Sequence, residues 1–326
     1  MRELMWRDAI CEALDEEMAR DENVFVMGED VARIGGNFKC TVGLYEKYGD
    51  LRVKDTPISE AGFVGMGVGA ALTGLRPVVE LMFGDFMMVA ADQLFNQMVK
   101  IAYMSGGQCH VPMVVRTPIG GGRSSAAQHS QSLQAWAAHI PGSKIALPST
   151  AGEAKGLLKT AIRDNNPVIF FEHKMLYTSK FDDVPEAAED VCIPFGQARM
   201  VTVGSDITVV ANSLMTIKAE KAAKRLQKEG ISVELIDLRT LVPMDTESII
   251  RSVKKTGRLL IVDEGHTSFG ISGEIAARIL PEVFYDLDAP IQRLGTADVP
   301  LPFSPALEFP LIPDDKQIEG KIREMI

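Results

Sequence analysis

The sequence predicts an α/β protein built from two doubly wound domains, each a parallel sheet with helices on both faces. Short apolar runs, typical of strands buried on both faces, alternate along the chain with segments of helical period. The alternation stops once, in an acidic stretch with prolines at residues 179–196, and then starts again. The length of 326 residues also favours two domains over one compact core.

The first domain is expected over residues 1–178. It begins with an amphipathic helix at residues 5–20, where apolar side chains recur at intervals of three and four. Apolar strands and further helices then alternate. In chain order we expect a strand at 24–28, a helix at 60–75, a strand at 77–81, a helix at 87–103, strands at 111–116 and 144–148, a helix at 151–163 and a strand at 167–172.

The second domain is expected over residues 197–326, with the acidic stretch as the linker. Its first helix ends at Gly230, the residue type that most readily adopts the left-handed conformation at a helix terminus. The expected elements are a strand at 206–211, a helix at 216–229, a strand at 233–238, a helix at 245–254, a strand at 258–264 and a helix at 272–280.

Charge and composition exclude several classes of function. The formal net charge is −10 and no basic stripe is present, which argues against a nucleic-acid partner. The sequence contains no run of about eighteen apolar residues, so no membrane span is expected. The four cysteines are widely scattered, which fits neither a zinc site nor a disulfide framework. Because the amino-terminal residues resemble neither a secretory signal nor a transit peptide, we expect a cytoplasmic protein.

The glycine-rich segment GFVGMGVGAALTG invites a dinucleotide-binding interpretation, which we reject. Counted from Gly67 and Gly69, the third glycine position of G-x-G-x-x-G/A holds Leu72, and no strand directly precedes the motif. Small residues at this spacing are more typical of close helix packing or a subunit contact. The P-loop motif is absent, and the absence of G-x-S-x-G weakens a hydrolase interpretation.

Glu60 lies in the first turn of a predicted helix, among apolar and glycine residues. A carboxylate at this place can simply complement the helix dipole, an effect worth less than about 1 kcal/mol. Alternatively, apolar walls raise its pKa, so that it can hydrogen-bond a ring nitrogen of a ligand. Taken alone, Glu60 favours the first interpretation.

Two other polar segments change this balance. The loop GGGRSSAAQHSQS places His129 between two predicted strands, where a histidine is well placed for proton transfer. The segment AIRDNNPVIFFE ends a helix on Asp-Asn-Asn before a buried strand. That ending is either an ordinary C-terminal turn or a set of oxygen atoms presented to a cation.

Seven motifs, in their order and spacing from about residue 2 to the carboxyl end, resemble one family. They are VMGEDV, DTPISEAGFVGMGVGAALTGLRPVVE, YMSGG, AAQHSQS, AIRDNNPVI, DLRTLVPMD and GTADVPLPF. These motifs are similar to those of the β subunit of the thiamine-diphosphate-dependent first component of 2-oxo acid dehydrogenase complexes. The resemblance implies a pyrimidine-binding domain first and a transketolase C-terminal-like domain second.

The resemblance implies roles for individual residues. Glu60 corresponds to the carboxylate that hydrogen-bonds the cofactor's pyrimidine ring, and protonation there favours the imino tautomer that activates the thiazolium. His129 corresponds to a histidine that faces substrate and intermediate and assists transfer to a lipoyl group. Glu29, Met82 and Phe86 correspond to further cofactor-binding positions.

A structural potassium ion is also found in some relatives. The resemblance implies that it is bound mostly through main-chain carbonyls, which leave little trace in the side chains. The corresponding positions here are Met113, Ala161, Ile162, Asp164 and Asn166.

The chain lacks one motif that the family chemistry needs. The resemblance implies that the diphosphate is held through a divalent metal bound by G-D-G and, some 25 to 30 residues later, N-N, because such a cation prefers carboxylate and amide oxygens. Here Asp50 and Asp85 follow glycines, but no G-D-G is present. We therefore expect an α subunit to hold Mg²⁺ and the diphosphate, in an α2β2 heterotetramer, and the isolated chain to be inactive.

The leading hypothesis is a β subunit that decarboxylates a 2-oxo acid and passes the acyl group to the lipoyl acyltransferase core. The substrate stays open: SSAAQHSQS resembles the pyruvate and acetoin branches more than the branched-chain one. A non-catalytic docking subunit is disfavoured because Glu60 and His129 are both present. A free-standing transketolase or deoxyxylulose-phosphate synthase relative is disfavoured by the short length and the missing metal motif.

Two features of the second domain stay without an assigned role. His266, just past a predicted strand, is either structural or part of a substrate channel. For each of Asp263, Glu264 and Glu274, we favour solvated acidic surface over a contact with a basic domain of the acyltransferase.

Overall fold

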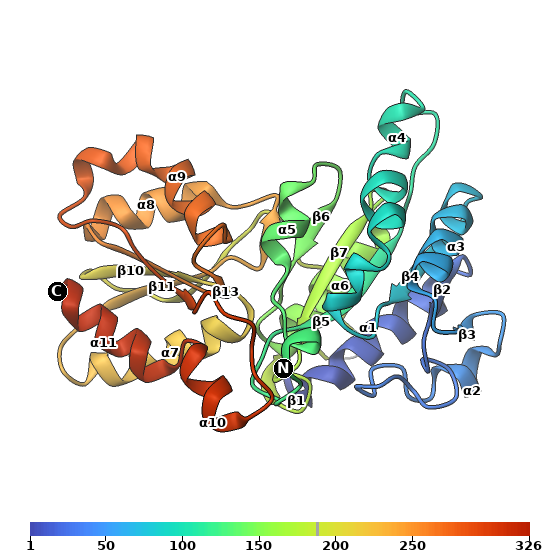
Figure 1. Cartoon of the computed structure of the whole chain (residues 1–326), viewed down its shortest axis with the longest axis horizontal. Helices are drawn as coiled ribbons and strands as arrows, with labels where there is room; N and C mark the ends of the chain where they lie inside the picture. The colour runs from blue at the N-terminus through green and yellow to red at the C-terminus, as the bar shows by residue number, and fades with distance from the viewer. Residues whose placement is uncertain (187–188) are drawn as a thin grey trace. The chain divides into compact units, whose positions relative to one another are not determined.

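The computed structural model describes residues 1–186 and 189–326, which form two compact units. Unit 1 contains residues 1–119 and 136–195, and unit 2 contains residues 120–135 and 196–326. Each unit contains a largely parallel sheet with helices packed on it, so the predicted α/β fold class is confirmed (Figure 1). The predicted linker at 179–196 includes residues 187 and 188, which lie outside the described residues.

The sheet of unit 1 runs in the order β6-β7-β5-β4-β2-β3, and all of these neighbours pair in parallel. Its strands are apolar and mostly buried, as expected for a sheet covered on both faces. Their bounds are β2 (Val24–Gly28), β3 (Val53–Asp55), β4 (Arg76–Glu80), β5 (Val114–Ile119), β6 (Lys144–Ala146) and β7 (Val168–His173).

Two helices of unit 1, α1 (Trp6–Arg20) and α6 (Ala151–Arg163), pack against each other. Buried Glu17 of α1 pairs with Arg163 of α6 at 2.6 Å. A capping box starts α6, in which the Thr150 side chain accepts a hydrogen bond from the main chain of Glu153. The other helices of unit 1 are α2 (Leu44–Tyr48), α3 (Glu60–Leu72) and α4 (Ile101–Met104); α5 (Gln134–His139) lies at the boundary of the two units.

The single helix expected at residues 87–103 is wrong. The chain instead forms a 3₁₀ turn, η1 (Gly84–Met88), a π-helical segment, η2 (Gln93–Met98), and the short helix α4. Apolar spacing shows which side chains are buried, but it does not distinguish an α turn from the wider π turn.

The sequence also failed to reveal an antiparallel pair in unit 1. β1 (Arg2–Met5) pairs with β8 (Lys180–Val184), which lies inside the stretch predicted as a linker. The segment KFDDV has three charged residues in five and only one buried residue, so it lacks the apolar pattern of a core strand.

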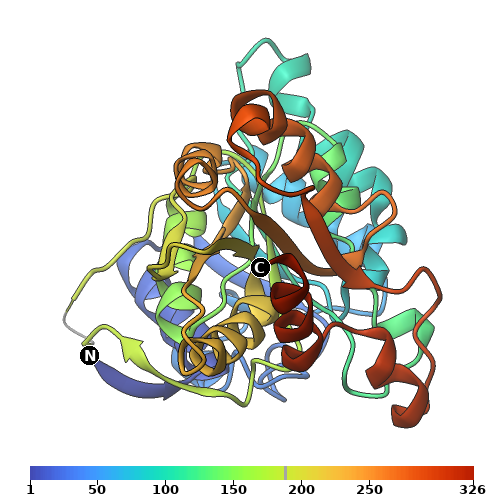
Figure 2. The same ribbon diagram turned by 90° about the vertical axis from the view of Figure 1, so that its left-hand side faces the viewer.

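The sheet of unit 2 runs in the order β14-β13-β10-β11-β9, parallel except for the β9–β11 pair. Helices α7 and α11 lie side by side, and α8 and α9 form a second pair (Figures 1 and 2). The strands are β9 (Arg199–Thr202), β10 (Ile207–Ala211), β11 (Val233–Asp237), β13 (Leu259–His266) and β14 (Gln292–Thr296), and a short β12 spans Thr240–Val242. The helices are α7 (Ser213–Gln227), α8 (Thr246–Thr256), α9 (Ile271–Val283), α10 (Pro305–Glu308) and α11 (Asp315–Met325), with 3₁₀ turns η3 (Ala127–His129), η4 (Phe284–Asp286) and η5 (Phe309–Leu311).

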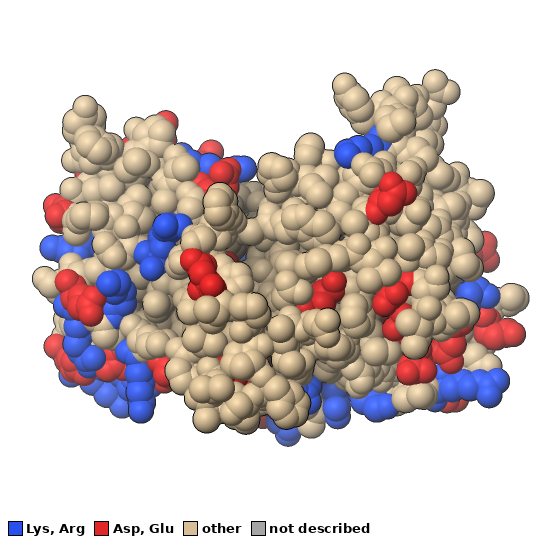
Figure 3. Space-filling model, in the orientation of Figure 1, with Lys and Arg blue, Asp and Glu red and all other residues tan. Residues whose placement is uncertain are grey.

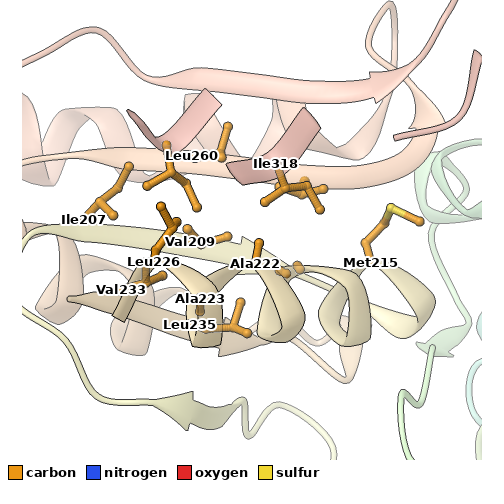
Figure 4. Packing of buried hydrophobic residues seen from close by; sticks show 14 of the residues in the cluster. Ile207, Val209, Met215, Ala222, Ala223, Leu226, Val233, Leu235, Leu260 and Ile318 are labelled. Carbon is orange, nitrogen blue, oxygen red and sulfur yellow. The ribbon is translucent and has the colours of Figure 1, made fainter. Parts of the chain in front are cut away.

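The core of unit 2 fills the space between the sheet and the α7–α11 pair (Figure 4). Val209 of β10, Leu226 of α7 and Ile318 of α11 are fully buried within it. Burial of these side chains is the main favourable term for folding of this unit, at roughly 25 cal/mol per Å² of apolar surface.

Acidic and basic side chains are interspersed on the face seen in Figure 3, and no basic stripe crosses the described part of that face. Among the helices that the structure describes, none combines the length and the apolar character that a bilayer crossing requires.

Candidate functional site

The carboxyl ends of β2 and β3 bring two acidic residues together. Glu29 directly follows β2, and Glu60 is the first residue of α3, the helix after β3. The two strands pair in parallel, with Gly28 opposite Asp55. A main-chain hydrogen bond of 2.9 Å from Thr56 to the carbonyl of Gly28 joins the segments that follow them. Adjacent parallel strand ends are the usual place for ligand binding in α/β proteins.

Both carboxyl groups are nearly withdrawn from solvent, with 6% of each residue exposed. Within the described residues, the Oε1 atom of Glu29 is buried without a hydrogen-bond partner. Burial, followed by the negative charges of Glu60 and Asp30, raises the pKa of Glu29 to about 7. This pair can therefore hold a proton near neutral pH and accept a hydrogen bond from a ligand.

The close approach of β2 and β4 depends on Gly28. A Cβ atom at this position would lie 2.5 Å from the carbonyl oxygen of Glu80, closer than any side chain tolerates. The segment after Glu29 then folds back, because Asp30 adopts a left-handed conformation (φ 58°) and the Asp55 carboxylate accepts a hydrogen bond of 2.7 Å from the main chain of Ala32. Local backbone geometry thus determines the path of the main chain on both sides of Glu29.

Met82 and Phe86 follow the carboxyl end of β4, the other neighbour of β2. Both are half-buried. The Phe86 ring packs edge-on against Phe83, with 5.8 Å between centroids, and Phe83 packs edge-on against Phe38 at 5.9 Å. The predicted apolar cofactor contacts therefore lie in unit 1, at the same edge of the sheet as Glu29 and Glu60.

A buried ion network in unit 1 was not expected from the sequence. Arg116 of β5 donates to both oxygens of Glu172, at 2.7 and 2.9 Å, and to Glu80 at 2.7 Å. The Tyr177 hydroxyl donates to Glu172 at 2.6 Å. Burial raises the pKa of Glu80, and the nearby Glu172 carboxylate adds to this effect, while Arg116 opposes it. The only signal in the sequence is one arginine in the otherwise apolar run VPMVVR.

His129 belongs to unit 2, whereas the other predicted catalytic and cofactor positions belong to unit 1. It is half-buried at the end of η3, and its main-chain N–H donates to the carbonyl of Ala126 at 3.3 Å. Ala126 itself has a left-handed conformation, with φ of 59°. The loop around His129 is therefore a defined structure with an unusual backbone.

Two of the five expected potassium ligands, Ile162 and Asp164, contact a protein cation. Nη1 of Arg76 donates to the carbonyls of Ile162 and Asp164, both at 3.0 Å, and the amine of Lys144 pairs with the Asp164 carboxylate. These oxygens suit a cation, and Arg76 already supplies positive charge to two of them. Within the described chain, no cluster of three or more His, Cys, Asp and Glu could hold a metal ion.

Two acidic residues that we expected on the surface are buried. Asp263 and Glu264, at the end of β13, are 2% and 6% exposed, so the surface prediction is wrong for both. An acidic pair after an apolar strand gives no indication of whether its partners lie in the core. Glu274 is exposed, as expected, and pairs with Arg278 within α9 at 2.5 Å.

His266 lines a pocket of about 420 Å³ within unit 2, together with Ser130, Ser268 and Asp298. Its Nδ1 lies 2.8 Å from the carbonyl oxygen of Ala297, so Nδ1 carries the proton and donates. The Ser130 hydroxyl is buried without a hydrogen-bond partner in the described chain.

Family models match both parts of the chain. The model "Transketolase, pyrimidine binding domain" matches residues 2–180, and "Transketolase, C-terminal domain" matches residues 196–318. A solved structure described as a split gene transketolase, an inactive β4 tetramer, is similar with a TM-score of 0.79, covering 99% of this chain and 98% of that one. Its identity of 22% shows the fold alone.

Curated relatives align along nearly the whole chain. Pyruvate dehydrogenase E1 component subunit beta of Rhizobium meliloti (strain 1021) is 49% identical over 97% of this chain and 68% of its own. The mitochondrial human subunit of that name is 47% identical over 98% and 90%. The 2-oxoisovalerate dehydrogenase subunit beta of Bacillus subtilis (strain 168) is 46% identical over 100% and 99%. The chain therefore belongs to the family of the E1 β subunits of pyruvate and 2-oxoisovalerate dehydrogenases, as its motifs predicted.

Proposed function

We propose that this chain is the β subunit of a thiamine-diphosphate-dependent 2-oxo acid dehydrogenase of the pyruvate type. It decarboxylates the 2-oxo acid and transfers the acyl group to a lipoyl group on an acyltransferase. The observation that carries the proposal is the buried pair Glu29 and Glu60 at adjoining strand ends, with one carboxyl oxygen unpaired in the described chain. Membership of the E1 β family supports it.

The residues fit the pyrimidine part of thiamine diphosphate. An aminopyrimidine offers N–H donors and a basic ring nitrogen, which match the unpaired carboxyl oxygen of Glu29 and the second carboxyl group beside it. When bound, the cofactor supplies the electron sink for decarboxylation. Glu60 would hold the proton at the ring nitrogen, Glu29 would accept a ligand N–H, and Met82 and Phe86 would form apolar contacts.

His129 is proposed to act on the substrate side. A neutral imidazole can accept a proton at one nitrogen and donate one at the other, so it can stabilise an oxyanion or protonate it. The loop glycines before it permit the backbone conformation that presents it. Its role in transfer to the lipoyl group is part of the same proposal.

The missing G-D-G motif supports a partner chain. We assign Mg²⁺ and the diphosphate to an α subunit, in an α2β2 heterotetramer located in the cytoplasm. In this assignment the pyrimidine contacts come from the first domain at 1–178, of which residues 120–135 fold with unit 2. The linker at 179–196 contains β8, and residues 197–326 form the second domain. The relatives' designation as "subunit beta" supports the heteromer.

A potassium ion at the positions proposed from the resemblance would share its carbonyls with Arg76. Thermal unfolding of the purified chain in K⁺ and in Na⁺ tests the ion. A rise in melting temperature specific to K⁺ supports the site, and equal melting temperatures in K⁺ and Na⁺ would refute it.

Turnover by the reconstituted pair tests the main proposal. The chain is co-expressed with a candidate α subunit and assayed on pyruvate, 3-methyl-2-oxobutanoate and acetoin, and the preferred substrate distinguishes the pyruvate type from the two alternatives. Glu60→Ala should abolish turnover, whereas Glu46→Ala, at an exposed position of the same unit, should not. Turnover by the chain alone would instead indicate a free-standing enzyme. A pair that is inactive with thiamine diphosphate present would indicate a docking subunit.

A further inference from the structure

The loop that carries His129 is held by acidic side chains from distant parts of unit 2. Glu308, at the end of α10, accepts hydrogen bonds from the main-chain N–H groups of Gly122 and Ser124, both at 2.8 Å. Glu264, in β13, accepts one from the main chain of Gly121 at 2.7 Å. Three main-chain donors within four residues thus point at two carboxylates.

Burial makes these hydrogen bonds strong. Glu308 is 0% exposed, and each of its carboxylate oxygens accepts a main-chain hydrogen bond from the loop. Successive N–H groups that converge in this way form a concave anion site, usually filled by a phosphate or another bound anion. Here a side chain of the same unit fills it, and hydrogen bonds to a charged acceptor are about twice as strong as neutral ones.

The glycines of the loop are needed for this approach. Gly122 has φ of 88°, in the region that favours glycine. A Cβ atom on Gly121 would lie 2.5 Å from the Cδ1 atom of Ile312 and 2.7 Å from that of Leu301, so both side chains would have to move to admit it. The run GGG thus allows the main chain to reach the buried carboxylates.

The loop stores backbone strain beyond the glycines. Ser124 and Ala126 have φ of 54° and 59°, in the left-handed region that L-residues avoid. Such residues persist only where surrounding contacts determine the conformation, and the hydrogen bond from Ser124 to Glu308 is such a contact. His129 follows directly in η3.

A second attachment fixes the far end of the loop. The side-chain amide of Gln134 donates to buried Asp263 at 2.9 Å. Asp263 in turn accepts hydrogen bonds from the Asn212 side chain at 3.0 Å and from the main chain of Gly265 at 3.1 Å. The segment that contains His129 is therefore attached on both sides, to Glu308 before it and to Asp263 after it.

We propose that Glu308 is a positioning residue, which holds the His129 loop in its working conformation through Gly122 and Ser124, with Glu264 as its neighbour. The inference rests on the proposed function for its catalytic consequence, because His129 is assigned to the substrate there. Misplacement of a catalytic group by about 1 Å can lower the rate roughly a hundredfold.

Hydrogen exchange in the full-length chain tests the attachment without reference to activity. In Glu308→Gln the side chain keeps its shape, but one acceptor becomes an NH₂ group that faces an N–H donor. Exchange at Gly122 and Ser124 should rise at least about tenfold, while the core strand β10 stays unchanged. Glu308→Asp, which keeps the charge on a shorter side chain, should restore part of the protection. Glu282→Gln, at an exposed site in α9, is the matched control and should change nothing.

Kinetics of the reconstituted complex test the consequence. Glu308→Gln should lower kcat about tenfold or more, with partial recovery in Glu308→Asp and unchanged affinity for thiamine diphosphate, because the assigned pyrimidine contacts belong to unit 1. A merely destabilised protein would lose cofactor affinity as well. Unchanged exchange at Gly122 and Ser124 would overturn the attachment, and faster exchange with unchanged kcat would overturn the positioning role. A wild-type complex without 2-oxo acid turnover would refute the proposed function instead, and the exchange result would still decide the attachment.

Discussion

The negative charge of Glu60 acts on Glu29 across two adjoining strand ends and, with burial, raises the pKa of Glu29 to about 7. Two carboxyl groups so close and so poorly solvated cannot both ionise without a large electrostatic cost. This electrostatic cost lowers the stability of the folded chain. A buried acid with a raised pKa beside a second acid is typical of sites that move or hold a proton.

This electrostatic cost predicts how stability depends on pH. In the unfolded chain Glu29 ionises near its ordinary pKa of 4.5, whereas the folded chain keeps it protonated up to about pH 7. Between these values the folded state binds more protons, so the free energy of unfolding falls as the pH rises, by at most about 3 kcal/mol. Urea unfolding of the isolated chain at pH 5 and pH 8 should show a larger loss in wild type than in Glu29→Gln. Equal losses in both proteins would refute the shift.

The buried arginine of β5 predicts a large effect of a single substitution. Arg116→Met removes the counter-charge of Glu80 and Glu172, and one uncompensated buried charge costs about 3–5 kcal/mol. Arg116→Lys keeps the charge but cannot bridge both oxygens of Glu172, so it should also destabilise. Arg251→Met, at an exposed position, should change the unfolding free energy by less than about 0.5 kcal/mol. A loss below 1 kcal/mol for Arg116→Met in urea unfolding would contradict the network.

The local sequence pattern correctly predicted the first and last residues of some elements. β2 at 24–28 and α6 at 151–163 have the expected bounds, because a fully apolar run and a capped amphipathic segment each determine their own structure. The start of α3 at Glu60 was also predicted, although Ser59 makes no side-chain capping hydrogen bond there. The acidic residue at that helix start could therefore be found from the sequence alone.

Contacts between distant residues could not be predicted. Arg116 and Glu172 are 56 positions apart, and Ser124 and Glu308 are 184 apart. Nothing in the local sequence around Glu308 distinguishes a buried acceptor of loop N–H groups from an ordinary surface acid. For the same reason, the sequence did not show that residues 120–135 fold with unit 2.

Burial predicts low reactivity of two thiols. Cys40 is 1% exposed and its pKa is raised well above the ordinary value, while burial raises the pKa of Cys11 to about 11. The thiolate is the reactive form, and at pH 8 only about a thousandth of Cys11 is ionised. Mass spectrometry after iodoacetamide treatment should find Cys40 unmodified and Cys11 slow in the folded chain, and both alkylated in urea. Rapid labelling of Cys40 under native conditions would be inconsistent with this core.

Two glycines of α3, two positions apart, should respond in opposite directions to the same substitution. A Cβ atom at Gly67 would lie 2.8 Å from Met113 and 2.9 Å from Val79, so Gly67→Ala pushes the helix away from the sheet and should cost about 1–3 kcal/mol. A Cβ atom at Gly69 meets nothing within 4 Å. Gly69→Ala should therefore stabilise the isolated chain by about 0.5–1 kcal/mol, because alanine loses less backbone entropy in a helix. Urea unfolding of both variants measures the difference. Similar values for the two would mean that the close packing of α3 on β4 does not explain the glycines.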